Sequence, residues 1–261
     1  MDKREQIARM AQTKEDEILL ARVYERITSA AARNIPAATA FLSKREQMLA
    51  AELLRGQDFV FFGGPAMAER EVCCYVPEYL DEGWLTGDEG PIAAVRAVYF
   101  AGDTLTHRDF LGALMGCGIK RETVGDIYVA TGRCDFLVTR DILPYVLQNL
   151  TDAGRTRLHL EEIPLSALEA PEQKTKQIRG TVSSLRLDGV VAEGFALSRS
   201  RAAEVITAGK TELNYTLCAK PDRAVAEGDV ISVRGLGKMR LEAVGGNTKK
   251  GRISIEICRY I

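Results

Sequence analysis

The order of strand-like and helix-like runs between residues 93 and 163 restricts the fold of this chain more than any other feature of its sequence. The runs follow one another as strand, helix, strand, strand, helix and strand, at residues 93–100, 106–117, 126–130, 134–139, 141–150 and 157–163. Thr106 is typical of a capped helix start, Gly118 of a helix end and Gly132 of a hairpin turn. This order predicts the split βαβ, ferredoxin-like βαββαβ fold, which many unrelated proteins share.

The central strands of this expected sheet lack the residues with which RNA-recognition modules stack bases. Such modules place several aromatic side chains and a basic residue on those strands. The run Cys134–Thr139 contains one aromatic residue and an acid. We therefore expect Phe136 and Tyr128 to be core residues or cross-strand partners rather than RNA contacts.

The first part of the chain has the pattern of packed helices. Thr13 and Ser43 each precede, by three residues, an acid that favours the first turn of a helix. Apolar residues recur at helical spacing after both positions. Asp58–Phe62 is a short strand-like run that ends in a Gly-Gly-Pro turn. We expect residues 1–76 to form a helical N-terminal domain with a short β segment.

Two boundaries divide the rest of the chain. A glycine-rich loop follows Pro77, and the segment Glu169–Lys176 is polar, contains a proline and has no periodicity. We therefore expect an α+β protein with a ferredoxin-like middle domain at residues 77–170 and a third domain at residues 178–261.

Composition excludes several classes of protein. Apolar runs such as Val98–Ala101 are far shorter than the ~18–20 residues of a membrane helix, so we expect no membrane partner. The charged start of the chain leads into no apolar signal segment, which predicts a cytoplasmic protein. The six cysteines include no Cys-x-x-Cys pair, and there are two histidines. We expect no metal site and no cofactor.

The charges are distributed unevenly along the chain. The net charge is -1, but residues 178–261 carry 14 Lys and Arg against 9 Asp and Glu, a net charge of +5. The first 177 residues carry 21 against 27, a net charge of -6. The basic end of the chain is where we look for a polyanion, although charge alone fits an ordinary solvated surface equally well.

The most informative helix start lies at Ser198. Leu187, Val190 and Val191 predict one short helix, and Ser198 can cap a second helix that extends to Gly209. Free backbone N–H groups, hydroxyls and two guanidiniums then meet at the positive end of a helix dipole. Such a start suits phosphate oxygens.

Segments of the third domain resemble the RNA-binding domain of small-subunit ribosomal protein four, also called the alpha-L motif. The matching segments are Arg186-Leu187-Asp188, Leu197-Ser198-Arg199-Ser200-Arg201-Ala202, Gly209, Asn214, Lys220-Pro221, Gly228-Asp229-Val230-Ile231 and Arg234-Gly235. Tyr215 departs from the motif, because most such domains have glycine there, so a different hairpin tip is expected. With the helical first domain, the βαββαβ middle and the run His107–Leu114, the whole chain resembles the bacterial YlmH family.

The resemblance implies a non-enzymatic, RNA-binding, ribosome-associated protein without catalytic residues. Members of the family are linked to the large ribosomal subunit that still carries peptidyl-tRNA, in rescue of stalled translation, and to roles in cell division. The implied partners are ribosomal RNA, the large ribosomal subunit and peptidyl-tRNA.

The candidate RNA-binding residues are the cations, hydroxyls and amide of the third domain. Plain solvated charge is an equally good interpretation for the two lysines near the C-terminus. The candidates are Arg186, Ser198, Arg199, Ser200, Arg201, Lys210, Asn214, Lys220, Arg234, Lys238, Arg240, Lys249 and Lys250.

Two other functions are weighed against this one. Alpha-L motifs also occur on pseudouridine synthases, whose catalytic aspartate lies in an Arg-Leu-Asp sequence like Arg186-Leu187-Asp188. Here that tripeptide opens a predicted helix, where Asp188 can serve the helix dipole, and a short motif has a high false-positive rate. A protein-interaction adaptor, for example in cell division, is the second alternative.

Overall fold

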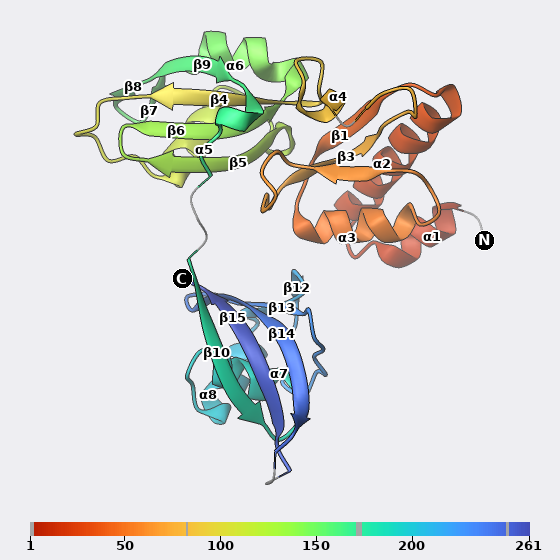
Figure 1. Ribbon diagram of the computed structural model, residues 1–261, viewed down its shortest axis with the longest axis vertical. Coiled ribbons are helices and arrows are strands. Elements are labelled where there is room, and N and C mark those ends of the chain that lie inside the picture. Colours follow the sequence, from red (N-terminus) through yellow and green to blue (C-terminus); the bar gives the residue numbers. More distant parts are fainter. Residues whose placement is uncertain (1–2, 82, 171–173, 249–250) are drawn as a thin grey trace. The chain divides into compact units, whose positions relative to one another are not determined.

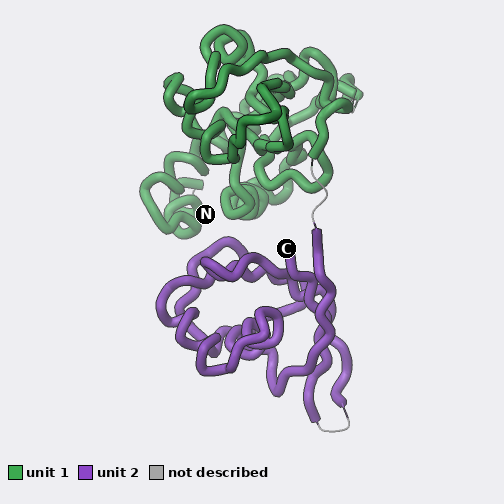
Figure 2. Tube along the Cα trace, turned by 90° about the vertical axis from the view of Figure 1, so that its left-hand side faces the viewer, with its two compact units in different colours: residues 1–171 green, residues 172–261 purple. Residues whose placement is uncertain are grey.

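The chain separates into two compact units, residues 1–171 and residues 172–261 (Figure 2). The computed structural model describes residues 3–81, 83–170, 174–248 and 251–261. Both units combine helices with antiparallel sheets, which confirms the α+β class. Each unit is described by itself.

The N-terminal part of the first unit contains helices and a small sheet (Figure 1). Its elements are α1 (Lys3–Met10), α2 (Lys14–Arg33), β1 (Ala37–Leu42), α3 (Lys44–Leu53), β2 (Val60–Phe62), β3 (Glu71–Tyr75) and α4 (Gly83–Thr86). Thr13 and Ser43 cap α2 and α3 in complete capping boxes, as expected. The three strands pair antiparallel in the order β1-β3-β2, so this part contains more strand than the short segment that the sequence predicts.

The middle of the chain contains the predicted βαββαβ series. Its elements are β4 (Ile92–Val98), α5 (His107–Gly116), η1 (Arg121–Thr123), β5 (Val124–Ala130), β6 (Arg133–Thr139), η2 (Arg140–Ile142), α6 (Leu143–Asn149), β7 (Asp152–Ala153), β8 (Thr156–Arg157), β9 (His159–Ile163) and η3 (Leu165–Ala167). The sheet has the antiparallel order β5-β6-β4-β9. The β7–β8 hairpin, between α6 and β9, is an addition that the sequence does not predict.

Both faces of this four-stranded sheet are buried. Val95 of β4 and Phe136 of β6 pack with α5 and α6 on one face. Ile92 and Leu137 pack on the other face with Phe41 of β1 and with residues of β3. The sheet face on which RNA-recognition modules stack bases is therefore covered by the N-terminal part of the same unit. The expectation that Phe136 is a core residue is confirmed, because its side chain is fully buried.

In its described residues, the second unit combines a sheet with the two helices α7 and α8 (Figure 1). Its elements are β10 (Thr175–Val182), α7 (Leu187–Gly194), α8 (Arg199–Thr207), β11 (Thr211–Leu213), β12 (Thr216–Leu217), β13 (Val230–Val233), β14 (Gly237–Asn247) and β15 (Ile253–Tyr260). The antiparallel sheet has the order β10-β15-β14-β13-β11-β12. The polar segment interpreted as a boundary already contains the first residues of β10, which pairs with β15 from Thr175 to Val182.

The two helices of this unit pack on a core of their own. Val190 of α7, Ile206 of α8 and Ile257 of β15 are fully buried in one apolar cluster. Gly194, the last residue of α7, lies directly against β14, since a Cβ there would lie 2.1 Å from the Met239 sulfur. This packing fixes the starts of α7 and α8, where the candidates Arg186, Ser198, Arg199, Ser200 and Arg201 lie.

Candidate nucleic-acid interface

A buried carboxylate joins the starts of the two helices. Asp188, in the first turn of α7, is 5% exposed. Its oxygens accept hydrogen bonds from Arg186 at 3.0 Å and from Arg199, the first residue of α8, at 3.2 Å. Burial by itself raises the pKa of the Asp188 carboxyl, but the bonds from the two guanidiniums outweigh it and the pKa lies below its ordinary value. Asp188 is therefore ionised at neutral pH and holds both arginines.

The loop after β12 lies against the same place. The Leu187 N–H donates to the Arg223 carbonyl at 2.8 Å, and the Asp188 N–H donates to the Pro221 carbonyl at 2.9 Å. We call Arg186, Asp188, Arg199, Lys220 and Arg223 the Asp188 cluster. Arg186 and Arg199 bind the buried acid. Lys220, Asp222 and Arg223 are exposed residues of the adjoining loop, so four cations stand against two acids here. The cluster therefore has an excess of positive charge facing water.

The start of α8 has the predicted cap. The Ser198 hydroxyl accepts a bond from the Arg201 N–H at 3.2 Å and lies 3.0 Å from the Ser200 hydroxyl. The Arg201 guanidinium pairs with Glu204 at 2.7 Å, and both side chains are more than half exposed. An exposed pair of this kind contributes ~0–1 kcal/mol, so Arg201 can exchange its partner for a phosphate at little cost.

The side chain of Asn214 stabilises the β11–β12 hairpin. Asn214 and Tyr215 both have positive φ, 49° and 61°, and form the two-residue turn between β11 and β12. The Asn214 side chain donates to Asp229 at 2.8 Å and accepts from the Val230 N–H at 2.9 Å. Its amide thus ties the hairpin to the start of β13. The hairpin keeps a two-residue turn although a tyrosine occupies the usual glycine position.

The other described candidate cations lie on β14 and in the chain just before β11 and just after β13. The Arg234 N–H donates to the Lys210 carbonyl at 2.8 Å, which brings these two exposed residues together. Lys238 lies over the Tyr260 ring at 5.0 Å, and Arg240 pairs with Glu242 at 2.8 Å. Lys249 and Lys250 lie outside the described residues.

In the ranges that the structure describes, no group of three or more His, Cys, Asp or Glu residues could hold a metal ion. Asp188, the counterpart of the aspartate in the Arg-Leu-Asp sequence, is buried and held by two guanidiniums. None of the helices in these ranges is both long enough and apolar enough to cross a membrane.

Fold and site together define a two-unit α+β protein whose C-terminal unit presents clustered cations. Residues 98–167 match a family model described as "Putative RNA-binding domain in YlmH". The chain is 35% identical over 216 residues to the "Ribosome-associated protein quality control protein P2" of Bacillus subtilis (strain 168), an alignment that covers 82% of this chain and 83% of the relative. The chain therefore belongs to the YlmH family, as its motifs indicate.

The chain is also similar to a solved structure. It is the "Cell division protein ylmH from Streptococcus pneumoniae", with a TM-score of 0.49 and 22% identity over 60% of this chain and 95% of the solved chain.

Two features of the site escaped the sequence analysis. Arg223 was not a candidate, although it follows the Lys220-Pro221 pair by two residues and its carbonyl receives the first N–H of α7. The family model also matches residues 98–167, a segment to which the sequence analysis assigned no RNA role. The signal for that segment was the run His107–Leu114, which carried part of the family resemblance.

Proposed function

We propose that this chain is a non-enzymatic RNA-binding protein that acts on the ribosome, in quality control or rescue of stalled translation. Its partners are ribosomal RNA and the large ribosomal subunit that carries peptidyl-tRNA, in the cytoplasm. The name of the relative from Bacillus subtilis, which matches over most of both chains, supports this role.

The Asp188 cluster is the structural observation that best supports the proposal. A buried carboxylate holds Arg186 and Arg199 in place, so that less side-chain entropy is lost when these guanidiniums meet phosphates. The backbone N–H groups at the start of α8 supply further donors at the positive end of the helix. Recognition then proceeds through phosphates and RNA shape, without base-specific bonds.

The same cluster is unsuited to pseudouridine synthase chemistry. A catalytic aspartate must reach its substrate, whereas Asp188 is 5% exposed and bonded to two arginines. We propose that it is a positioning residue for Arg186 and Arg199.

Co-sedimentation with purified large ribosomal subunits over a salt series tests the proposal. Binding should weaken as salt rises, with a log–log slope of roughly -0.7 to -0.9 per neutralised phosphate. Absence of co-sedimentation at low salt, or an affinity indifferent to salt, would exclude phosphate-based docking.

A further inference from the structure

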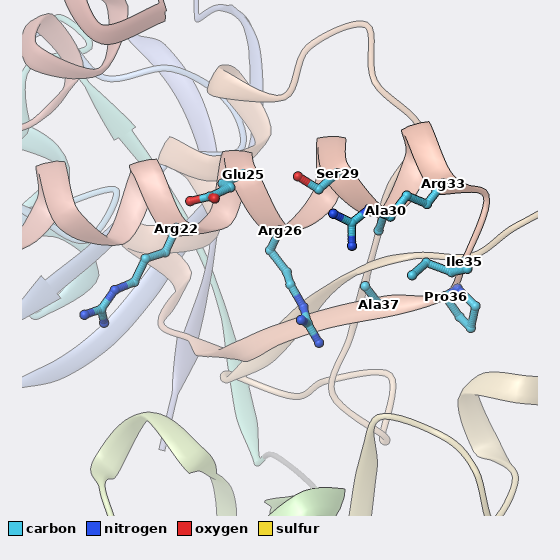
Figure 3. Close-up of a pocket in the computed structure, with 9 residues that line it drawn as sticks. All are labelled: Arg22, Glu25, Arg26, Ser29, Ala30, Arg33, Ile35, Pro36 and Ala37. Carbon is cyan, nitrogen blue, oxygen red and sulfur yellow. The ribbon is translucent and has the colours of Figure 1, made fainter.

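A row of arginines lies along the second helix, far in sequence from the Asp188 cluster. Arg22, Arg26 and Arg33 of α2 all belong to exposed residues. At 100° per residue, these positions fall within ~40° of arc on one side of the helix. Figure 3 shows them along α2, with Ile35 and Pro36 at the approach to β1 beside them.

These arginines line a shallow groove of about 400 Å³, whose other lining residues are Glu25, Ser29, Ala30, Ile35, Pro36 and Ala37. Three guanidiniums face one carboxylate, so the lining has an excess of positive charge. The Arg26 Nε donates to the Ala38 carbonyl at 3.3 Å, which anchors the middle arginine against β1. The groove therefore offers cations, a hydroxyl and an apolar floor.

The outer two arginines lack acidic partners, unlike other cations of the region. Lys14 pairs with Glu17, and Arg45 pairs with Asp16. Within the described ranges, by contrast, neither Arg22 nor Arg33 has an ion-pair partner. Two uncompensated cations on one face of a helix make a surface that is complementary to an anion.

The spacing of the cations distinguishes a polyanion from a small anion. Residues 22, 26 and 33 are separated by about 6 Å and about 10 Å along the helix axis, and by ~16 Å from first to last. A single phosphate group cannot contact cations spread over that length. A nucleic-acid strand, with a phosphate on every nucleotide, can.

We propose that the α2 groove is a second RNA-binding surface, which holds a stretch of RNA backbone through Arg22, Arg26 and Arg33. It lies outside the segment 98–167 that the family model matches and outside the C-terminal unit. The inference rests on the proposed RNA-binding function and extends it to the N-terminal part of the chain.

The test reverses the two unpaired arginines in the full-length chain. At about 0.1 M salt each neutralised phosphate contributes a factor of roughly five to affinity. The variant Arg22→Glu/Arg33→Glu should therefore bind purified large-subunit ribosomal RNA about 20-fold more weakly than the unmodified chain. The log–log salt slope should shrink by roughly 1.4–1.8. Arg26 is retained because it contacts the backbone of β1.

The matched control is Lys14→Glu/Arg55→Glu, which makes the same change in net charge at exposed positions of the same unit away from the groove. It should bind RNA like the unmodified chain, and Arg22→Lys/Arg33→Lys should retain most of the affinity. If RNA affinity falls equally in both reversed variants, or does not fall in Arg22→Glu/Arg33→Glu, the α2 groove is not a second RNA-binding surface.

Two further outcomes distinguish a failure of the inference from a failure of the proposed function. An unmodified chain that fails to bind the RNA would overturn the proposed function itself. Inorganic tripolyphosphate is the probe for a small anion. If it binds the unmodified chain tightly but does not bind Arg22→Glu/Arg33→Glu, and the two proteins bind RNA equally, the groove is a site for a small anion. That result would overturn the inference.

Discussion

The Arg199 guanidinium lies 3.2 Å from the Asp188 carboxylate, and this contact joins the first residue of α8 to the first turn of α7. Arg201, two residues further on, instead pairs with the exposed Glu204. The two arginines of one helix start therefore differ in what they contribute. Arg199 takes part in the packing of the unit, whereas Arg201 is tethered only on the surface.

Charge reversal should separate these two contributions. Arg201→Glu should weaken co-sedimentation with large ribosomal subunits and leave the melting temperature nearly unchanged, because its pair with Glu204 is exposed. Arg199→Glu should also weaken co-sedimentation, but it sets a second carboxylate beside buried Asp188 and should lower the free energy of unfolding by ~1–3 kcal/mol. Thermal unfolding and sedimentation of the two variants decide this.

Glu204→Gln is the control for Arg201. It frees the guanidinium without removing it, so RNA affinity should stay the same or increase. If Arg201→Glu and Glu204→Gln weaken co-sedimentation equally, the pair itself matters and Arg201 does not contact phosphate.

The ionised state of Asp188 should appear in the pH dependence of stability. The folded pKa lies below the ordinary carboxyl value of ~3.9, so the carboxylate stabilises the folded chain above that value, and this contribution is lost as pH falls through the folded pKa. Asp188→Asn should lower the free energy of unfolding by ~1–3 kcal/mol at neutral pH. The difference from the unmodified chain should shrink below about pH 4. A difference independent of pH in urea unfolding would contradict the assigned ionisation.

Local signals predicted the helices and the middle sheet well. Thr13, Ser43 and Ser198 cap helices as expected, since capping depends on residues within one turn. Gly118 follows the end of α5 and Gly132 lies in the turn of the β5–β6 hairpin. Both have positive φ, as the sequence indicates.

Strands stabilised by distant partners were missed. β1 has the alanine-rich sequence Ala37–Leu42, and β3 has the pair Cys73-Cys74, so neither has a strong strand signal. Tertiary burial stabilises both, as it does β15, which pairs with β10 from the other end of the unit. The convergence of Arg186 and Arg199 on Asp188 was likewise not predicted, because it depends on how α7 and α8 pack against each other.

The extent of the C-terminal unit gives a prediction about fragments. Residues 172–261 have their own core and should fold alone, whereas a fragment starting at residue 178 lacks Thr175–Gln177 and three of the eight residue pairs that join β10 to β15. The shorter fragment should have the lower melting temperature. Equal melting temperatures would show that the first residues of β10 contribute nothing.

The same fragments compare the two units as RNA binders. We expect residues 172–261 to bind large-subunit ribosomal RNA more tightly than residues 1–171, because the net charge of residues 178–261 is +5. The family description of residues 98–167 predicts that the first fragment also binds. Filter binding of both fragments at one salt concentration measures the ratio of their RNA affinities. Tighter binding by residues 1–171 would show that the first unit, and not the C-terminal unit, is the main RNA-binding part.

The last prediction concerns the contact between the N-terminal part and the middle sheet. A Cβ on Gly125 of β5 would lie 2.7 Å from the Phe41 ring of β1 and 2.9 Å from the Leu137 Cβ. Gly125→Ala should therefore lower the free energy of unfolding by ~1–3 kcal/mol through overpacking. Gly112→Ala is the matched control, because a Cβ at Gly112 of α5 meets nothing within 4 Å, and it should raise stability by ~0.5–1 kcal/mol.

A second substitution shows whether the Phe41 ring is the obstacle. Phe41→Leu shortens the side chain and should cost ~1–2 kcal/mol alone. Combined with Gly125→Ala it makes room for the new methyl group, so the double variant should be more stable than the sum of the single effects by ~0.5–3 kcal/mol. Additive effects in urea unfolding would mean that β1 and β5 do not pack through these residues.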